Sequence, residues 1–430
     1  MALNWSEIPE DILDFCAARV LLDAKQIATF RSVCKSWKTS VTNAKRRIIP
    51  SAPYLILQNR DNDTKLAPDN EEGIRSFYCL SSKRVFDFNL PTQERRCWGT
   101  PYGWFFTMGF DFNINLFNPL SGSQISLPSQ QTLPDKSWSP SNPRHVCQSY
   151  VKNFALTSDP SNWTKPTTSS ATPLVIAMYG GVRKLAVACP GDESWTPLDG
   201  SPTGNHDILF YKNKLYIVGV GGVLKVCDLN ITPLKVAIYA SPPRGADNVD
   251  KFYLVEMSGD LHLVVRIFDA PGYKKAYEEE EEEHIVEEDE EDEKEEQEEE
   301  EEEEEEEEHG VEEEEEDEED DDLFEFHYET VRFLVFKLNL HTREWIKLAD
   351  LGGHAIFVGN HIPFAISASS YLEVKGNCIY FTDDHHELYQ YRFCDMGVYD
   401  IKKKTVEPIY SSDSKHSKFA RPSFFMPSAK

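Results

Sequence analysis

The stretch FLVFKL at residues 333–338, followed after a short turn by WIKL at residues 345–348, decides the fold of this chain. Each segment has the length and the aliphatic and aromatic content of a β-strand, and the turn between them indicates a hairpin. A similar strand followed by a short tail recurs at residues 113–128, 184–198 and 397–409. Repetition of a hairpin along a chain predicts that similar sheets follow one another.

The rest of the chain beyond Pro50 consists of short strand-like runs separated by Gly, Pro, Asn and Asp, without a helical period. The body is therefore expected to be all-β. Repeats of about 50 residues, in the style of kelch repeats, favour a β-propeller, and the length of the body allows about six to eight blades. A pair of β-sandwiches is the structural alternative, against which the repeat period argues. Because a propeller closes by joining its first and last blades, we expect Tyr54 to Leu57 to pair with Phe424 and Phe425.

Residues 5–44 differ from the body, because they have the spacing of three short helices. Ile12, Leu13 and Cys16 lie on one helical face, and Asp23 can cap a second helix. A chain of about 40 residues cannot usually bury enough surface to fold alone. The surplus of apolar side chains is therefore expected to form a docking surface.

The segments WSEIPEDIL at residues 5–13 and FRSVCKSW at residues 30–37 resemble an F-box. That family joins a substrate-recognition domain to the small adaptor protein of cullin-RING ubiquitin ligases. Ile8 stands where the family usually has Leu, a change of similar volume that we expect to be tolerated. The resemblance implies that the adaptor is bound by Ile8, Pro9, Ile12, Leu13, Ile27, Phe30, Val33, Cys34 and Trp37. The alternative is a helical cap that packs on the rest of the chain.

Four segments of the body resemble a large group of plant F-box proteins whose kelch-like half is a domain of unknown function. They are residues 104–128, 379–384, 395–400 and 421–428. The expected fold class is therefore α+β and multidomain, with a small three-helix F-box before an all-β propeller. We expect the F-box at residues 1–47, a linker and first strand at residues 48–72, and the propeller at residues 73–430.

The segment Glu278–Asp322 contains 37 of the 74 acidic residues and one lysine. Its charge is therefore −36, which leaves +6 on the other 385 residues. The segment lacks the apolar side chains of a core, and its like charges repel. We expect a disordered Glu-rich insert at residues 270–329, within one blade of the propeller. Either the insert is only a solvated loop, or it attracts a basic protein electrostatically. In the second case salt would screen the attraction.

The sequence contains no motif typical of a serine hydrolase, a nucleotide-binding loop or a zinc protease. Gly219–Lys225 is expected to be a hairpin turn with positive φ rather than a phosphate loop. The run DDHHE at residues 383–387 groups potential metal ligands, but neighbouring residues in a strand point to opposite faces. We therefore expect a polar turn there, with neither metal nor cofactor. Tryptophans in blades are either core residues or partner anchors, and this choice stays open for Trp98, Trp104, Trp163, Trp195 and Trp345.

Nine scattered cysteines without a CxxC pair favour reduced thiols, and hence a protein of the nucleus or cytoplasm. Neither a secretory signal nor an apolar run of about eighteen residues is visible, and no basic patch favours nucleic-acid binding. The leading hypothesis is a non-catalytic substrate receptor of an SCF-type ubiquitin ligase, whose partners are the adaptor, the cullin and a target protein held by the propeller. The alternatives are an acidic scaffold or chaperone for basic partners and a propeller enzyme.

Overall fold

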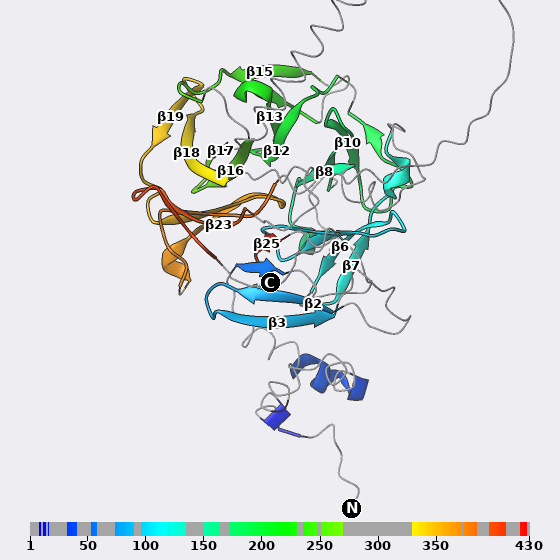
Figure 1. The fold of residues 1–430 in the computed structure, drawn as a ribbon. Helices are drawn as coiled ribbons and strands as arrows, with labels where there is room; N and C mark the ends of the chain where they lie inside the picture. Colours follow the sequence, from blue (N-terminus) through cyan, green and yellow to red (C-terminus); the bar gives the residue numbers. More distant parts are fainter. Residues whose placement is uncertain are drawn as a thin grey trace, which may run out of the picture. The chain divides into compact units, whose positions relative to one another are not determined.

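The structure is a computed structural model, and it describes part of the chain. The described residues are 8–9, 12–13, 16, 32–40, 53–57, 74–89, 96–119, 121–134, 150–163, 173–198, 200–229, 235–246, 251–269, 329–371, 373–384, 395–409 and 422–427. At residues 74–75 and 86–89 the description covers the backbone alone. Within these limits the chain forms six sheets that follow one another around a common centre (Figure 1).

Each sheet is one blade of a six-bladed β-propeller. Blade one contains β25 (Ser423–Phe425), β1 (Tyr54–Ile56), β2 (Ile74–Cys79) and β3 (Arg84–Asn89). Blade two contains β4 (Arg96–Gly99), β5 (Phe105–Met108), β6 (Ile114–Asn118) and β7 (Ser123–Ser126). Blade three contains β8 (Val151–Leu156), β9 (Val175–Tyr179), β10 (Lys184–Ala188) and β11 (Thr196–Pro197).

The other three blades follow in chain order. Blade four contains β12 (Asn205–Tyr211), β13 (Lys214–Gly219), β14 (Leu224–Cys227) and β15 (Val236–Ala240). Blade five contains β16 (Lys251–Met257), β17 (Asp260–Asp269), β18 (Glu329–Asn339) and β19 (Glu344–Leu348). Blade six contains β20 (His354–Val358), β21 (Phe364–Ser367), β22 (Cys378–Phe381), β23 (Gly397–Asp400) and β24 (Thr405–Glu407).

The inner strands of neighbouring blades lie beside one another, in the pairs β25 with β4, β8 with β12, β12 with β16, and β16 with β21. The prediction of an all-β propeller is therefore confirmed, with a blade number of six, and the alternative of two sandwiches is wrong. The hairpin read from residues 333–338 and 345–348 is the antiparallel pair β18 and β19, in which Leu338 faces Trp345.

The two ends of the body close the ring as expected. β1 pairs antiparallel with β25, placing Tyr54 opposite Phe425 and Leu55 opposite Phe424. The joint continues into blade two, where Gly99 donates its N–H to Ser423 Oγ at 2.9 Å. A Cβ at Gly99 would lie 1.7 Å from the carbonyl oxygen of Phe424, so only glycine permits this approach.

Blade six departs from the antiparallel pattern that the repeats predict. β20 is inserted between β21 and β22, and it pairs parallel with β22. The loop from β20 to β21 then reaches blade two, where Ile362 donates its N–H to the carbonyl of Gly99 at 3.1 Å. Ile362 is buried in the same apolar cluster as Trp98 of β4. This loop therefore ties blade six to blade two next to the joint between the chain ends.

Only parts of the expected three-helix segment belong to the described residues. Residues 12–13, 16, 32–33 and 35–40 are helical, and the second helix, predicted around Ile27 and Phe30, lies outside the described residues. Contacts divide the chain into Met1–Ile267 with Thr330–Lys430 and a separate unit, Phe268–Glu329. The expected insert falls on that second unit and outside the described residues, except that Glu329 begins β18. No helix within the described ranges is long and apolar enough to span a membrane.

Candidate functional site

The first expected adaptor contacts lie on a helical turn that begins near Ile8 and Pro9. Leu13 donates its N–H to the carbonyl of Pro9 at 3.0 Å, which closes the turn. Ile12 is 49% exposed, whereas the neighbouring Leu13 is buried. Ile8 is half-buried and Pro9 is exposed. Of these four side chains, Ile12 is the large aliphatic one that is most accessible to a partner.

The second group of expected contacts lies at residues 32–40, of which 32–33 and 35–40 are helical. Lys38 donates its N–H to the carbonyl of Cys34 at 3.0 Å. Val33 is 47% exposed, and Cys34 and Trp37 are half-buried. The structure thus presents one exposed aliphatic side chain in each described helical part, and the expected contacts Ile27 and Phe30 lie outside the described residues.

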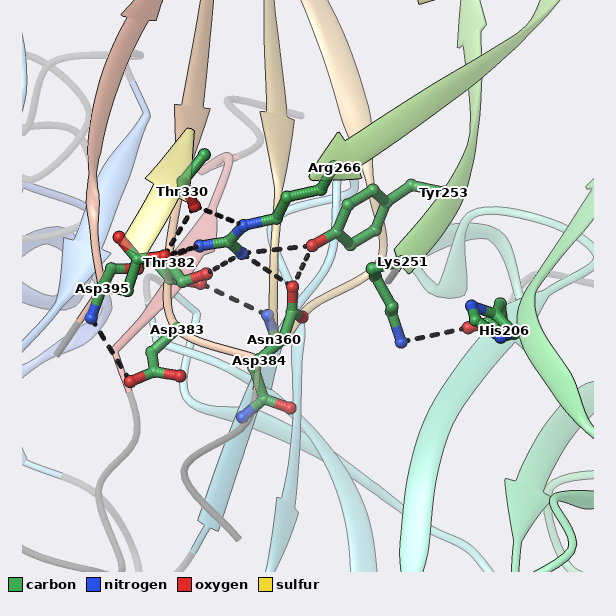
Figure 2. A network of polar contacts seen from close by, with 10 residues as sticks. All are labelled: His206, Lys251, Tyr253, Arg266, Thr330, Asn360, Thr382, Asp383, Asp384 and Asp395. Atoms are coloured by element: carbon green, nitrogen blue, oxygen red, sulfur yellow. Dashed lines mark hydrogen bonds and ion pairs between the residues drawn. The ribbon is translucent and has the colours of Figure 1, made fainter. Parts of the chain in front are cut away.

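Sequence reasoning missed a cluster of buried polar side chains between blades five and six (Figure 2). Its centre is Arg266 on β17, which is fully buried. The guanidinium forms ion pairs with Asp384 at 2.7 Å and with Asp395 at 3.0 Å, across the seam. Its Nε donates to Thr330 Oγ1 at 2.8 Å, and Thr330 donates in turn to Asp395 at 2.6 Å.

The charges in this cluster stabilise one another. Burial alone favours the neutral form of a guanidinium, but Tyr253, Asp384 and Asp395 raise the pKa of Arg266 above its ordinary value. Burial, reinforced by Asp384, holds the pKa of Tyr253 well above its usual range. Tyr253 therefore stays protonated and donates its hydroxyl proton to Asp384. Arg266 also donates to the carbonyls of Thr382 and Asp395, at 2.7 and 3.1 Å.

This cluster joins blades five and six through ion pairs and hydrogen bonds, and its buried groups do not form an accessible reaction centre. Arg266, Thr382 and Asp395 are buried and hydrogen-bonded to one another, so a substrate would have to separate them to reach their polar atoms. The run DDHHE was expected to be a polar turn, but Asp383 is buried and the side chain of Asp384 is only 7% exposed. Asp383 accepts a hydrogen bond from the N–H of Asp395 at 3.4 Å. Residues 385–387 lie outside the described residues. Within the described part of the chain, no group of three or more His, Cys, Asp or Glu side chains is arranged to hold a metal ion.

A second buried carboxylate, Asp207, lies in the seam between blades three, four and five. Its oxygens accept hydrogen bonds from Asn153 Nδ2 and from the N–H of Leu254, each at 2.8 Å. Irregular register in β8, between Val151 and Asn153, and in β12 beside Asp207 accompanies this contact. Burial raises the pKa of Asp207 to about 7, although the Leu254 N–H and the charge of Lys251 act in the opposite direction.

Buried polar side chains also pair with backbone groups on the inner strands of other blades. Arg96 donates to the carbonyl of Val151 at 3.1 Å and to Asn360 Oδ1 at 3.2 Å, which joins blade two to blades three and six. Inner strands have unpaired backbone groups on one edge, and burying these groups without partners costs free energy. The polar seams are therefore part of what holds the propeller together.

The remaining predictions concern turns and tryptophans. The hairpin turn expected at Gly219–Lys225 is confirmed, with φ of 71° at Gly221 and 77° at Gly222. Trp98, Trp104 and Trp195 are buried, which makes them core residues. Trp163 and Trp345 are half-buried and pack against apolar clusters.

Comparison with known proteins shows which family and which proteins this chain is similar to. The family model described as the KIB1-4 beta-propeller matches residues 77–400. The F-box protein SKIP23 of Arabidopsis thaliana is 23% identical over 432 residues, covering 94% of this chain and 91% of that protein. The Arabidopsis thaliana F-box protein At2g26160 is 22% identical over 397 residues, covering 89% and 96%. A chain of the Nidogen/Laminin complex has a TM-score of 0.38 at 9% identity, covering 88% and 100%, and at that score no common fold follows.

Proposed function

The chain belongs to the KIB1-4 beta-propeller family, and from this premise we propose that it is the substrate-recognition subunit of an SCF-type cullin-RING ubiquitin ligase. The N-terminal segment docks on the adaptor, and the propeller, with its kelch-like repeats, holds a target protein. The subunit itself contributes no catalytic residue. It works in the nucleus or cytoplasm, where adaptor and cullin are its partners.

One observation carries this proposal: relatives named F-box proteins align with nearly the whole chain, not with the propeller alone. The exposed side chains of Ile12 and Val33 are consistent with it, because a helix can lay its apolar side chains into a hydrophobic groove of a partner. The mechanism is proximity. A target held by the propeller has a high effective concentration at the ubiquitin-loaded enzyme, so its lysines react faster.

The test is calorimetric binding of the full chain to purified adaptor. We expect tight binding that changes little with salt, because the contacts are apolar. The double variant Ile12→Ser, Val33→Ser should weaken binding at least about thirtyfold, whereas Leu13 is buried and is a poorer test. The matched control is Val85→Ser, Val406→Ser, because these blade valines are 45% and 44% exposed.

The control should bind like the unchanged chain. If the adaptor does not bind the unchanged chain, or if both double variants bind equally well, the receptor function is wrong.

A second function is favoured by the charge of −36 at residues 278–322. In this alternative the acidic segment is the working part, and the protein is a scaffold for basic partners. Deletion of residues 278–322 separates the two functions. Adaptor binding survives the deletion in the receptor, whereas binding of a basic protein such as a histone disappears in the scaffold.

A further inference from the structure

Two exposed valines lie on neighbouring turns of blades three and four. Val182 is in the turn between β9 and β10, and Val220 follows β13. They are 54% and 70% exposed, and Val220 is the most exposed large apolar side chain in the described part of the chain. Gly204 connects them, because it donates its N–H to the carbonyl of Val182 at 2.8 Å and accepts from the N–H of Val220 at 3.0 Å.

Hydrogen bonds and close packing fix the conformation of the turns that present these valines. Asn205 is fully buried, and its Nδ2 donates to the carbonyls of Arg183 at 2.8 Å and Pro202 at 2.7 Å. Beyond Val220, Gly222 lies against Phe252 of the next blade, so closely that a Cβ would be 2.8 Å from the ring. The valines therefore do not lose much conformational freedom when a partner covers them, which favours binding.

The turns that carry the two valines, and the connection that follows β15, also carry basic residues. Arg183 and Lys184 follow Val182 directly, Lys225 follows the second turn, and Arg244 is exposed on the connection from β15 to β16. Among the described residues of these turns, 180–184, 200–206, 219–225 and 241–246, none is acidic. Asp207 in β12 is buried and turned toward Asn153 and Leu254, so it does not neutralise the surface. Asp199, Asp247 and Asp250 of the same connections lie outside the described residues.

From this juxtaposition we propose that the turns of blades three and four form a docking surface for an acidic segment of a target protein that carries an aliphatic or aromatic side chain. The inference rests on the proposed function, because it names the face of the receptor and the chemistry of its target. The apolar side chain covers Val182 and Val220, and the flanking carboxylates face Arg183 and Arg244.

The charges and the valines together exclude other occupants. A second copy of this chain, related by a two-fold axis, would bring Arg183 and Arg244 against the same cations, which repel. A nucleic acid would use the cations, but its backbone offers no apolar group to the two valines. An acidic peptide with one apolar anchor satisfies both features.

The probe is a fluorescein-labelled peptide, Asp-Glu-Asp-Leu-Phe-Asp-Glu-Asp, whose binding to the full chain is measured by fluorescence anisotropy. We expect saturable binding that weakens as salt rises. The double variant Val182→Ser, Val220→Ser should raise the Kd at least about fivefold, whereas the matched control Val85→Ser, Val406→Ser should not change it. Arg244→Gln should reduce the salt dependence, and Lys404→Gln, an exposed cation of blade six, should leave it unchanged.

Two further probes test the contribution of charge. The same peptide with Asn and Gln in place of Asp and Glu should bind more weakly. A chain without residues 278–322 should bind the acidic peptide more tightly, because the deleted charge repels it.

The proposal is overturned if the peptide does not bind, if both valine pairs matter equally, if binding is lost with residues 278–322, or if an oligothymidylate binds at these valines in its place. Adaptor binding is measured on the same preparations. If the adaptor binds and the peptide does not, the docking surface is wrong while the receptor function stands. If the peptide binds and the adaptor does not, the receptor function fails and the surface remains.

Discussion

Two seams of the propeller bury carboxylates, and they differ in what faces the charge. Between blades five and six, Asp384 and Asp395 face the guanidinium of Arg266. In the seam of blades three to five, Asp207 accepts two uncharged donors instead. Burial makes an ionised carboxylate unfavourable in both places, because it loses its hydration. Only in the first seam does a hydrogen-bonded cation compensate for this cost. The first seam should therefore depend on its cation, and the second should depend on pH.

The largest effect is expected from Arg266→Met, which fills similar space but leaves Asp384 and Asp395 buried without their cation. Removing one partner of a buried ion pair is strongly destabilising, because the remaining charge stays desolvated. The free energy of unfolding should fall by about 5 kcal/mol, measured by urea unfolding monitored by tryptophan fluorescence.

Lys83→Gln is the control, because Lys83 pairs with Glu373 at 3.0 Å on an exposed surface. Its unfolding midpoint should not move. If the two variants are equally stable, the cation does not hold the seam, and the contrast between the seams disappears.

Asp207 provides the second largest effect, and it appears as a dependence on pH. The pKa of Asp207 is raised by burial to about 7 in the folded chain, from 3.8 when exposed. The folded state therefore prefers the protonated carboxyl, and this contribution is complete below pH 3.8 and is lost as the pH rises through 7. The loss is at most about 4 kcal/mol, and Asp207→Asn should remove it.

The measurement is urea unfolding of both proteins between pH 4 and pH 8. The difference in unfolding free energy should change by about 1.4 kcal/mol per pH unit between the two pKa values, with Asp207→Asn gaining relative to the unchanged chain as the pH rises. Parallel curves would mean that Asp207 remains ionised throughout, like a carboxylate with a bonded cation.

The two seams also mark the limit of what the sequence could predict. The pairing of Tyr54 with Phe425, which closes the ring of blades, could be predicted, because the strands near the two ends of a propeller must pair with each other. An arginine in the apolar run of β17 indicates that a buried charge needs a partner. It does not say which partner, since Asp384 and Asp395 lie 118 and 129 positions away, among many other carboxylates.

The inserted strand of blade six was missed for a related reason. Residues 354–358 have the pattern of a buried strand, but the pattern is the same for parallel and antiparallel pairing. Only the return of the chain through β21 before β22 makes β20 parallel to β22. For the adaptor site, residue types and spacing supplied the candidates, whereas the contrast between exposed Ile12 and buried Leu13 required the folded chain.

The smallest effect is expected from Thr330→Val. This variant tests whether the Thr330 hydroxyl stabilises the charged seam in addition to the ion pairs. The hydroxyl of Thr330 accepts from Arg266 Nε and donates to Asp395, so valine removes two hydrogen bonds while keeping the shape of the side chain. Arg266 keeps both carboxylates, and the cost should therefore be about 1–2 kcal/mol, well below that of Arg266→Met.

Thr330 stands at the start of β18 and Arg266 near the end of β17, so the hydroxyl also joins the two strands that flank residues 270–328. Hydrogen exchange at the backbone amides of residues 264–267 and 330–333 should accelerate in this variant, while β12 and β16 around Asp207 keep their protection. A loss as large as that of Arg266→Met would show that the hydroxyl, rather than the pairing of opposite charges, distinguishes the two seams.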